Sequence, residues 1–404
     1  MERQHANRAR GIAVVSLLLA GVTAVAVMTR LWLLTAVPIG FLFGFFLERS
    51  DLCGASAFSE VVLMRDWRKL FGIWVVIVVS MVVFALGDAL GLIRLNPKPL
   101  FWAGALIGGV IFGAGIVLAG GCISGVLFKA GQGNVSSMAA LAGVPLGIAG
   151  VLYGPLHEAH VHLKTLLVAG ADGQVPTLPR LTGIPYWLLA LLFAAVTLVL
   201  AIVIARRRNA SAASRGGSGN RPKKGLTLGR AWRPWQSGIA IGVLALAAYV
   251  SSAASGRNYP LGTAGGVVGV AVMAVDTPDE VVWQAPRKAS AGGRAPAKGP
   301  PAASESPRKR VVLWMVLLVV MLVVGSHWSA RLRGSFKLLP KPPDETIIAF
   351  FGGVMVGAGA ALGSGCIVGH IMSGVALMSI ASILFFAAVL LSNWVTTRLY
   401  LMGR

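Results

Sequence analysis

The sequence predicts an all-α polytopic membrane protein built from two pseudo-symmetric halves. Of its 404 residues, 56% are hydrophobic and only 12% are charged, whereas soluble domains carry about 25% charged residues. Apolar stretches able to enter or cross about 30 Å of hydrocarbon recur along the chain. The clearest of these stretches are 11–28, 71–86, 184–205, 236–250, 311–325 and 375–391. A glycine-rich phrase that occurs twice indicates the internal repeat.

The chain begins with a short basic tail, 1–10, before its first apolar stretch. This arrangement raises the possibility of a cleaved signal peptide. No small-x-small cleavage site follows, however, and the chain continues into the apolar LWLLTAVPIGFLFGFF. We therefore expect the first stretch to be an uncleaved anchor helix.

A basic linker, 206–233, divides the membrane region into a first half, 11–205, and a second half, 234–404. The linker has nine Lys or Arg residues and no acidic residue, and the whole chain has a net charge of +22. By the positive-inside rule the linker is cytoplasmic. Its charge favours contact with anionic lipid rather than nucleic acid.

The repeated phrase occupies 108–125 and 352–369, where eleven of eighteen aligned positions are identical. Its skeleton is a glycine, a second glycine four residues later, and a cysteine nine residues after that. The skeleton occurs at Gly40, Gly44 and Cys53, at Gly109, Gly113 and Cys122, at Gly353, Gly357 and Cys366, and more weakly at Gly238, Gly242 and Ser251. Two copies on each side of the linker predict homologous halves, which in transporters meet at a site near the bilayer midplane.

Two loops bear on the topology. The loop 156–183 has little positive charge and fits the outside face, whereas an insert, 276–310, is rich in Pro, Ala, Gly, Lys and Arg and is expected to be disordered. The basic end of that insert and the basic loop 331–341 flank a single span, so one of them must violate the positive-inside rule. Inverted halves would place the insert outside and 331–341 inside, but charge alone leaves this open.

Glycines also flank the cysteines themselves, at Gly121 and Gly125 and again at Gly365 and Gly369. Each would weaken a continuous helix by about 1 kcal/mol, so they favour a helix that stops in the membrane, turns and restarts. Irregular backbone at that depth must be buried in protein or line a polar cavity. The free N–H groups of a restarting half-helix attract anions. The phrase therefore predicts two re-entrant half-helices that meet at a pore.

The chain has only three cysteines, Cys53, Cys122 and Cys366, and no C-x-x-C pair. This pattern argues against a disulfide framework or a closed zinc site. A lone buried cysteine is usually a small hydrophobic residue, but three at one skeletal position favour a function. Neutral thiols are weak donors and soft acceptors, which suits a soft, sulfur-bearing anion passed along by weak contacts. Transport of sulfite or selenite, a thiol redox or persulfide-carrying sulfurtransferase protein, and a purely structural role remain open.

Several polar residues are weaker candidates for the pore. Lys129 could draw a dianion inward, Gln132 and Asn134 could donate hydrogen bonds to it, and His370 could help to bind it. For Lys129 the alternative is a lysine at the membrane interface, and for His370 it is helix packing.

Two further clusters of charged or metal-ligating residues have a structural interpretation. Glu48, Arg49 and Asp51 are expected to form a solvated ion cluster at a helix end. The external residues His157, His160 and His162 have spacing that suggests a metal, but they lack the zincin pattern, so no metal site is predicted.

The phrases ERSDLCGASAFSEVVLMRD, GGCISGVLFKAGQGN and GSGCIVGHIMSG resemble the YeeE/YedE family of sulfur-transport membrane proteins. The resemblance covers nearly all of both halves. It implies thiosulfate uptake across the bacterial inner membrane through an hourglass-shaped helical protein whose centre is lined by Cys53, Cys122 and Cys366. It also implies a small cytoplasmic TusA-like sulfurtransferase as a partner. Asp51 and Gly54 depart from the family's usual first motif, R-F-C-F-A-S-A-F, so the entrance there is expected to differ.

The sequence contains no nucleophile–base pair, P-loop or cofactor fingerprint. We therefore expect a transporter that is not an enzyme and uses no cofactor. Its expected ligand is thiosulfate or a related sulfur anion, and its expected surroundings are the lipid bilayer.

Overall fold

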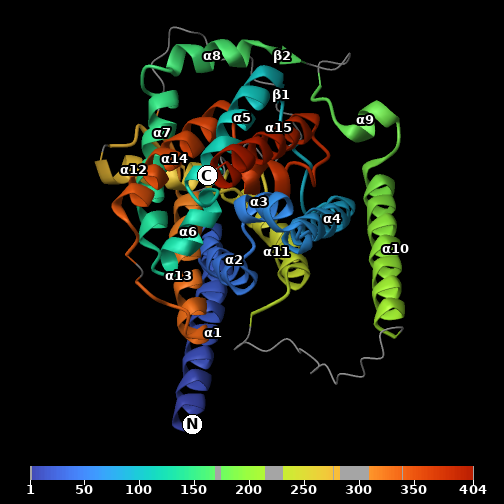
Figure 1. Cartoon of the computed structure of the whole chain (residues 1–404), viewed down its shortest axis with the longest axis vertical. Helices are drawn as coiled ribbons and strands as arrows, with labels where there is room; N and C mark the ends of the chain where they lie inside the picture. Colours follow the sequence, from blue (N-terminus) through green and yellow to red (C-terminus); the bar gives the residue numbers. More distant parts are fainter. Residues whose placement is uncertain are drawn as a thin grey trace.

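The computed structural model describes residues 2–168, 174–213, 231–275, 277–282, 309–338 and 340–403, and it is almost entirely helical (Figure 1). Ten segments of the described chain are long and apolar enough to cross a membrane. They are Gly11–Thr29, Trp32–Met64, Arg68–Ala89, Trp102–Gly131, Val135–Leu152, Tyr186–Val203, Pro234–Ala254, Leu313–Arg333, Pro343–Leu362 and Ile380–Met402. The predicted all-α polytopic membrane fold is confirmed.

The part of the chain before the basic linker contains ten α-helices, a 3₁₀-helix and a two-stranded antiparallel sheet in its described residues. The helices are α1 (Glu2–Thr29), η1 (Trp32–Thr35), α2 (Ala36–Ser50), α3 (Gly54–Met64), α4 (Arg68–Ala89), α5 (Trp102–Leu118), α6 (Ile123–Gly131), α7 (Val135–Leu152), α8 (His157–Thr165), α9 (Leu178–Thr182) and α10 (Tyr186–Ala213). Strands β1 (Leu100–Phe101) and β2 (Leu167–Val168) pair antiparallel.

The part after the linker repeats the alternation of long and short helices. It contains α11 (Pro234–Ala254), α12 (Ala264–Val275), α13 (Leu313–Arg333), α14 (Pro343–Leu362), the π-helix η2 (Val368–Met372), α15 (Ile380–Thr396) and the π-helix η3 (Thr397–Met402). Strands β3 (Glu280–Val282) and β4 (Arg310–Val312) pair in parallel, which joins the two ends of the predicted insert. The rest of the insert and most of the linker lie outside the described residues.

Helices of the two parts interleave in one bundle instead of forming separate bodies. Helix α2 packs against α13, α4 against α11, α5 against α15, and α7 against α14. The Gly-x-x-x-Gly pairs of the repeat lie at these four crossings. At each crossing the missing side chain lets two backbones touch, because a Cβ on the glycine would clash with a carbonyl oxygen of the facing helix. These clashes would be with Leu318 O at Gly40, Val389 O at Gly113, Gly72 O at Gly238 and Val144 O at Gly357. The glycine ridges thus join each half to the other.

The expectation of a solvated ion cluster at the end of α2 is wrong for Glu48 and Arg49, whereas about half of the Asp51 side chain is exposed (48%). The side chains of Glu48 and Arg49 are fully buried. Glu48 pairs with Arg333 Nη2 at 2.7 Å, while Asp51 pairs with Lys69 Nζ at 2.6 Å. A segment distant in sequence closes over the helix end, and local sequence carries no signal of that contact.

Candidate functional site

Each of the three cysteines lies immediately before a short helix that follows a break. Cys53 precedes α3, Cys122 precedes α6, and Cys366 precedes the helical turn that leads into η2. In each break the residue two positions earlier has a left-handed backbone: φ is 49° at Asp51, 65° at Gly120 and 60° at Ser364. Such a residue reverses the chain direction sharply, and two of these three positions are occupied by non-glycine residues at an energetic cost. The three thiols therefore share one local geometry.

The structure brings Cys53 and Cys122 together although they come from different helix breaks. Both sulfurs lie beside the same residue, Gly125. Gly125 permits the approach, because a Cβ at that position would clash with Cys53 Sγ and lie 3.5 Å from Cys122 Sγ. Cys122 Sγ also lies 3.3 Å from Ser124 Oγ. We call Cys53 and Cys122 the paired thiols.

Cys366 lies against the same region from the second half of the chain. A Cβ on Gly54, next to Cys53, would clash with Ile367, next to Cys366. The Cys366 thiol itself has a hydroxyl partner, Thr263 Oγ1, at 3.3 Å. Among the described residues, Cys122 and Cys366 thus each have a hydroxyl partner at 3.3 Å, Ser124 for Cys122 and Thr263 for Cys366.

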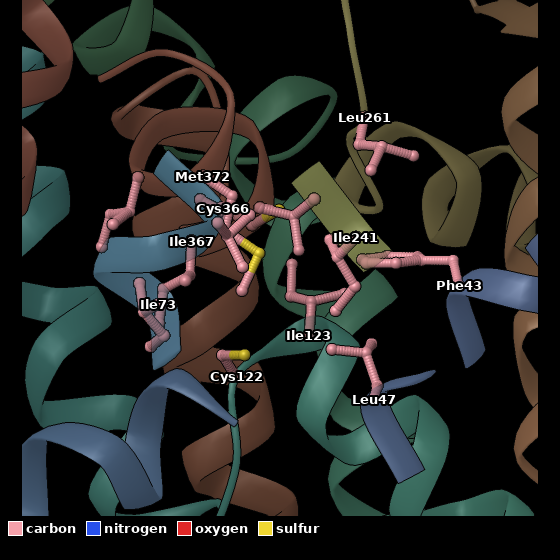
Figure 2. Close-up of a cluster of buried hydrophobic side chains, with 14 of the residues drawn as sticks. Phe43, Leu47, Ile73, Cys122, Ile123, Ile241, Leu261, Cys366, Ile367 and Met372 are labelled. Carbon is pink, nitrogen blue, oxygen red and sulfur yellow. The ribbon is translucent and has the colours of Figure 1, made fainter. Parts of the chain in front are cut away.

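The sulfurs are enclosed by apolar side chains. At most 1% of each cysteine is exposed, and all three belong to one buried cluster. Figure 2 shows Cys122 and Cys366 in this cluster with Ile123 and Ile367 beside them. Side chains of Leu47, Ile241 and Leu261 complete the surroundings drawn there. The three sulfurs therefore lie in apolar surroundings, shielded from solvent.

Two cations lie near Cys366, on loops between long helices. Lys98 Nζ donates to Ser364 O at 2.6 Å, and Arg257 Nη1 donates to Pro260 O at 2.6 Å. Both cations lie 5.3 Å from the ring centre of Tyr259, whose hydroxyl donates to Gly369 O at 2.6 Å. Within the described chain, neither cation is paired with a carboxylate.

A cavity opens beside this cluster. It measures about 230 Å³ and is lined by Lys98, Pro99, Phe101, Ala105, Gly363, Ser364, His370 and Ala381. A hydrated small anion would fit in such a volume, since one water needs about 10–15 Å³ on this measure. The two cations and the cavity together form what we call the Lys98 mouth.

His370 supports the turn before Cys366. Its Nε2 lies 2.7 Å from Gly363 O and its Nδ1 lies 3.0 Å from Ser382 Oγ, so Nε2–H donates to the carbonyl and the hydroxyl donates to Nδ1. The ring also stacks on Phe385 with centroids 4.4 Å apart. Both ring nitrogens are therefore engaged, which is the packing alternative of the sequence analysis.

The remaining predicted pore residues take varied places. Lys129 Nζ donates to Gly120 O at 2.6 Å, so it lies at the turn before the paired thiols. Gln132 donates to Glu48 at 3.1 Å, and Asn134 caps α7 by accepting from Ser137 N at 3.1 Å. These two amides hold local structure and do not contact a cysteine.

The glycines and Ser251 complete the predicted set. A Cβ on Gly121 would lie 3.1 Å from Val126 N, and a Cβ on Gly365 would clash with Lys98 Nζ. Ser251 is different from the cysteines, because it lies within α11 and accepts from Trp314 Nε1 at 2.8 Å. The structure does not bring it to the start of a helix.

Sequence reasoning missed Thr263, Lys98 and Arg257. The repeat spacing pointed to Ser251 instead of Thr263, because helix α11 continues past Ser251 and ends only at Ala254. The two cations come from loops in different halves, and only their place in the fold shows that they converge. A signal for Thr263 existed in its position directly before an apolar glycine-rich helix, where Thr is a favoured first residue.

The histidines of α8 do not form a metal centre. No group of three or more His, Cys, Asp or Glu side chains that could hold a metal ion occurs among the residues that the structure describes. Only 3% of His160 is exposed, and this burial lowers its pKa to about 4. The ring is therefore neutral near pH 7.

Comparison with known proteins agrees with the geometry. The chain is 29% identical over 373 residues to the thiosulfate transporter TsuA of Spirochaeta thermophila, covering 89% of this chain and 96% of that protein. It is 26% identical over 356 residues to the thiosulfate transporter TsuA of Escherichia coli, covering 86% and 88%. A stretch of 103 residues, 25% of this chain and 24% of its relative, is 37% identical to the Probable transporter YedE of Escherichia coli. Residues 49–395 match the sequence profile described as sulphur transport, and the chain belongs to this family.

Proposed function

We propose that the chain is a channel-like permease for thiosulfate or a closely related sulfur anion, and not an enzyme. The observation that supports this proposal is that three thiols, each at its own helix break, are buried in the core, where Gly54, next to Cys53, packs against Ile367, next to Cys366. The thiosulfate transporters to which the chain is similar over most of its length support the substrate.

The order of the contacts suggests how the anion passes. Lys98 and Arg257 attract a dianion into the cavity, where it replaces the carboxylate that these cations lack. The anion then meets Cys366 and, across the contact between Gly54 and Ile367, the paired thiols. Neutral thiols bind weakly, and several weak sites in series allow an anion to enter and leave.

Inverted symmetry of the two halves is part of the proposal. Helices α2 and α5 cross α13 and α15, and their counterparts α11 and α14 cross α4 and α7. Each of the four is followed by a break and a short helix. We infer that these short elements are re-entrant half-helices, two from each face of the membrane, which give the pathway an hourglass shape.

The basic segments support an orientation in the bacterial inner membrane. Trp232 at the end of the basic linker donates its N–H to Arg49 O at 2.9 Å, and Arg333 in the basic 331–341 region pairs with Glu48. Both segments therefore lie at one end of the bundle, which we assign to the cytoplasm. Helix α8 and strand β2 lie at the opposite end from the N-terminus (Figure 1). The Lys98 mouth then faces outward, and a small cytoplasmic TusA-like sulfurtransferase would receive the anion.

Uptake of ³⁵S-thiosulfate into proteoliposomes tests the proposal, together with growth of a sulfur-starved host on thiosulfate. We expect Cys53→Ala, Cys122→Ala and Cys366→Ala each to lose most uptake at normal expression. Full uptake in all three variants would contradict it.

The adjacency of the paired thiols also favours a second candidate, a sulfurtransferase that carries a persulfide. That protein would need one thiol to become a nucleophilic thiolate. Mass spectrometry after exposure to thiosulfate separates the candidates: a permease leaves all three cysteines unmodified, whereas a sulfurtransferase gains the mass of one sulfur atom on Cys53 or Cys122.

A further inference from the structure

Thr263 occupies the same kind of place as a pore cysteine. It lies directly before α12, as Cys53 lies directly before α3, and it is fully buried. Its hydroxyl points to Cys366 Sγ, 3.3 Å away, and that sulfur is its one side-chain hydrogen-bond partner within the described chain. Threonine before a helix usually bonds the free N–H groups of the first turn. Here Gly266 N and Val267 N instead lie 3.1 and 3.2 Å from the Thr263 carbonyl oxygen.

The surroundings of Thr263 suit an anion. The guanidinium of Arg257 lies beside the preceding residue, since a Cβ on Gly262 would be 2.8 Å from Nη2. Arg257 in turn shares the ring of Tyr259 with Lys98. The Thr263 hydroxyl thus contacts a thiol, and the residue before it in the chain, Gly262, lies beside one cation of the Lys98 mouth.

Cys122 and Cys366 each lie beside a hydroxyl, but the two hydroxyls have different origins. Ser124 lies two residues after Cys122 in the same chain segment, whereas Thr263 comes from a separate part of the chain, next to Gly262 and Arg257. Thr263 and Cys366 together offer one hydroxyl and one thiol. A hydroxyl donates stronger hydrogen bonds to charged oxygens than a thiol does. Thiosulfate has both kinds of acceptor, sulfonate oxygens at one end and a soft sulfur at the other.

We propose that Thr263 is a specificity-determining residue of the permease, whose hydroxyl holds a sulfonate oxygen while the Cys366 thiol contacts the terminal sulfur. This pair therefore selects anions that carry oxygen and soft sulfur at opposite ends. Sulfate lacks the soft sulfur, and hydrosulfide lacks the oxygens. The inference rests on the proposed function and assigns the recognition step to one pair within the pathway.

Three substitutions in proteoliposomes test this assignment by the initial rate of ³⁵S-thiosulfate uptake. Thr263→Val keeps the shape of the side chain but removes the hydroxyl, and we expect kcat/KM to fall about tenfold or more, the effect of one lost hydrogen bond to a charged group. Thr263→Ser keeps the hydroxyl, and we expect it to stay within about threefold of the unmodified protein on the same grounds. Thr263→Cys, which recreates a thiol pair, should resemble Thr263→Val for thiosulfate.

Competition by unlabelled anions provides a second measurement. The relative inhibition by two anions would not change if Thr263 had only a structural role. Sulfite carries the oxygens but no terminal sulfur, so its inhibition should weaken in Thr263→Val more than in Thr263→Ser. Hydrosulfide inhibition should be the same in both variants. Equal losses for the two inhibitors would overturn the assignment.

A control uses the same substitution at Thr35, a buried threonine whose hydroxyl donates to Trp32 O at 2.6 Å, also contacts Ser251 Oγ, and contacts no cysteine. Thr35→Val should leave kcat/KM within about twofold, whatever change in stability the loss of these two buried contacts causes. The outcomes also separate the two proposals. No thiosulfate uptake by the unmodified protein overturns the proposed function, whereas normal uptake by Thr263→Val overturns only the role of Thr263.

Discussion

The two sulfur-bearing pairs of this protein share a local design and differ in their surroundings. Cys122 and Cys366 each follow a glycine-rich break, each have a left-handed residue two positions earlier, and each have a lysine amine bonded to the carbonyl of that residue. Cys122 lies beside the Cys53 thiol and the Ser124 hydroxyl, whereas the partner of Cys366 is the hydroxyl of Thr263. The comparison teaches that the repeated motif gives both sites the same backbone, while Cys366 takes its partner from outside the motif and Cys122 takes its neighbours from within it.

Glycine three residues after each cysteine gives the sharpest test of this difference. A Cβ on Gly125 would clash with Cys53 Sγ, whereas on Gly369 it would lie 3.7 Å from the nearest atom, Lys98 Nζ. We expect Gly125→Ala to separate the paired thiols and reduce thiosulfate uptake more than tenfold, with a destabilisation of about 1–3 kcal/mol from overpacking. Gly369→Ala should keep most uptake and serves as the matched control.

The measurements are initial uptake rates and the melting temperatures of both purified variants. Similar losses of uptake in Gly125→Ala and Gly369→Ala would show that uptake does not depend on the close approach that Gly125 allows between Cys53 and Cys122. That result would also remove the distinction between the two pairs.

The cations near Cys366 should act on capture of the anion. Arg257→Gln removes a charge that has no carboxylate partner in the described chain, and we expect the KM for thiosulfate to rise about tenfold with a smaller change in kcat. Raising the ionic strength should increase KM in the unmodified protein and affect Arg257→Gln less. A fall in kcat at constant KM would instead place Arg257 in a later step.

The sequence indicated the repeated motif that the two sites share, but not all the side chains that lie beside each cysteine. The glycine spacing revealed the repeat and the common position of the three cysteines in it, and the structure places the same glycines at four helix crossings, where small residues allow close packing. The spacing pointed to Ser251 where the structure has Thr263 before a helix, since spacing along a chain does not record where a helix ends. Lys98 and Arg257 could not be found that way, as they meet only when the two halves are packed together.

The dependence of uptake on external pH should test the role of Lys98. This loop residue faces Arg257, Tyr259, Cys366 and His370, and burial lowers its pKa to about 7, with the charge of Arg257 adding to the shift. The amine is therefore charged below pH 7 and loses its charge as pH rises through 7. We expect uptake at low substrate concentration to fall severalfold between pH 6 and pH 8. Lys98→Arg, which stays charged, should flatten this profile, and an unchanged slope in that variant would assign the titration to another group.

Lys129 should give the smallest effect, because the proposed order of contacts places it after the thiols and its amine already bonds Gly120 O. We expect Lys129→Met, which keeps the length of the side chain, to lower uptake only about two- to threefold and to leave the KM for external thiosulfate unchanged. In the proposed pathway, Lys98 at the turn before Cys366 contributes to capture, whereas Lys129 holds the turn before Cys122 and favours release inward. A rise in KM as large as that of Arg257→Gln would mean that the anion reaches both lysines from the same side, and the proposed order of contacts would be wrong.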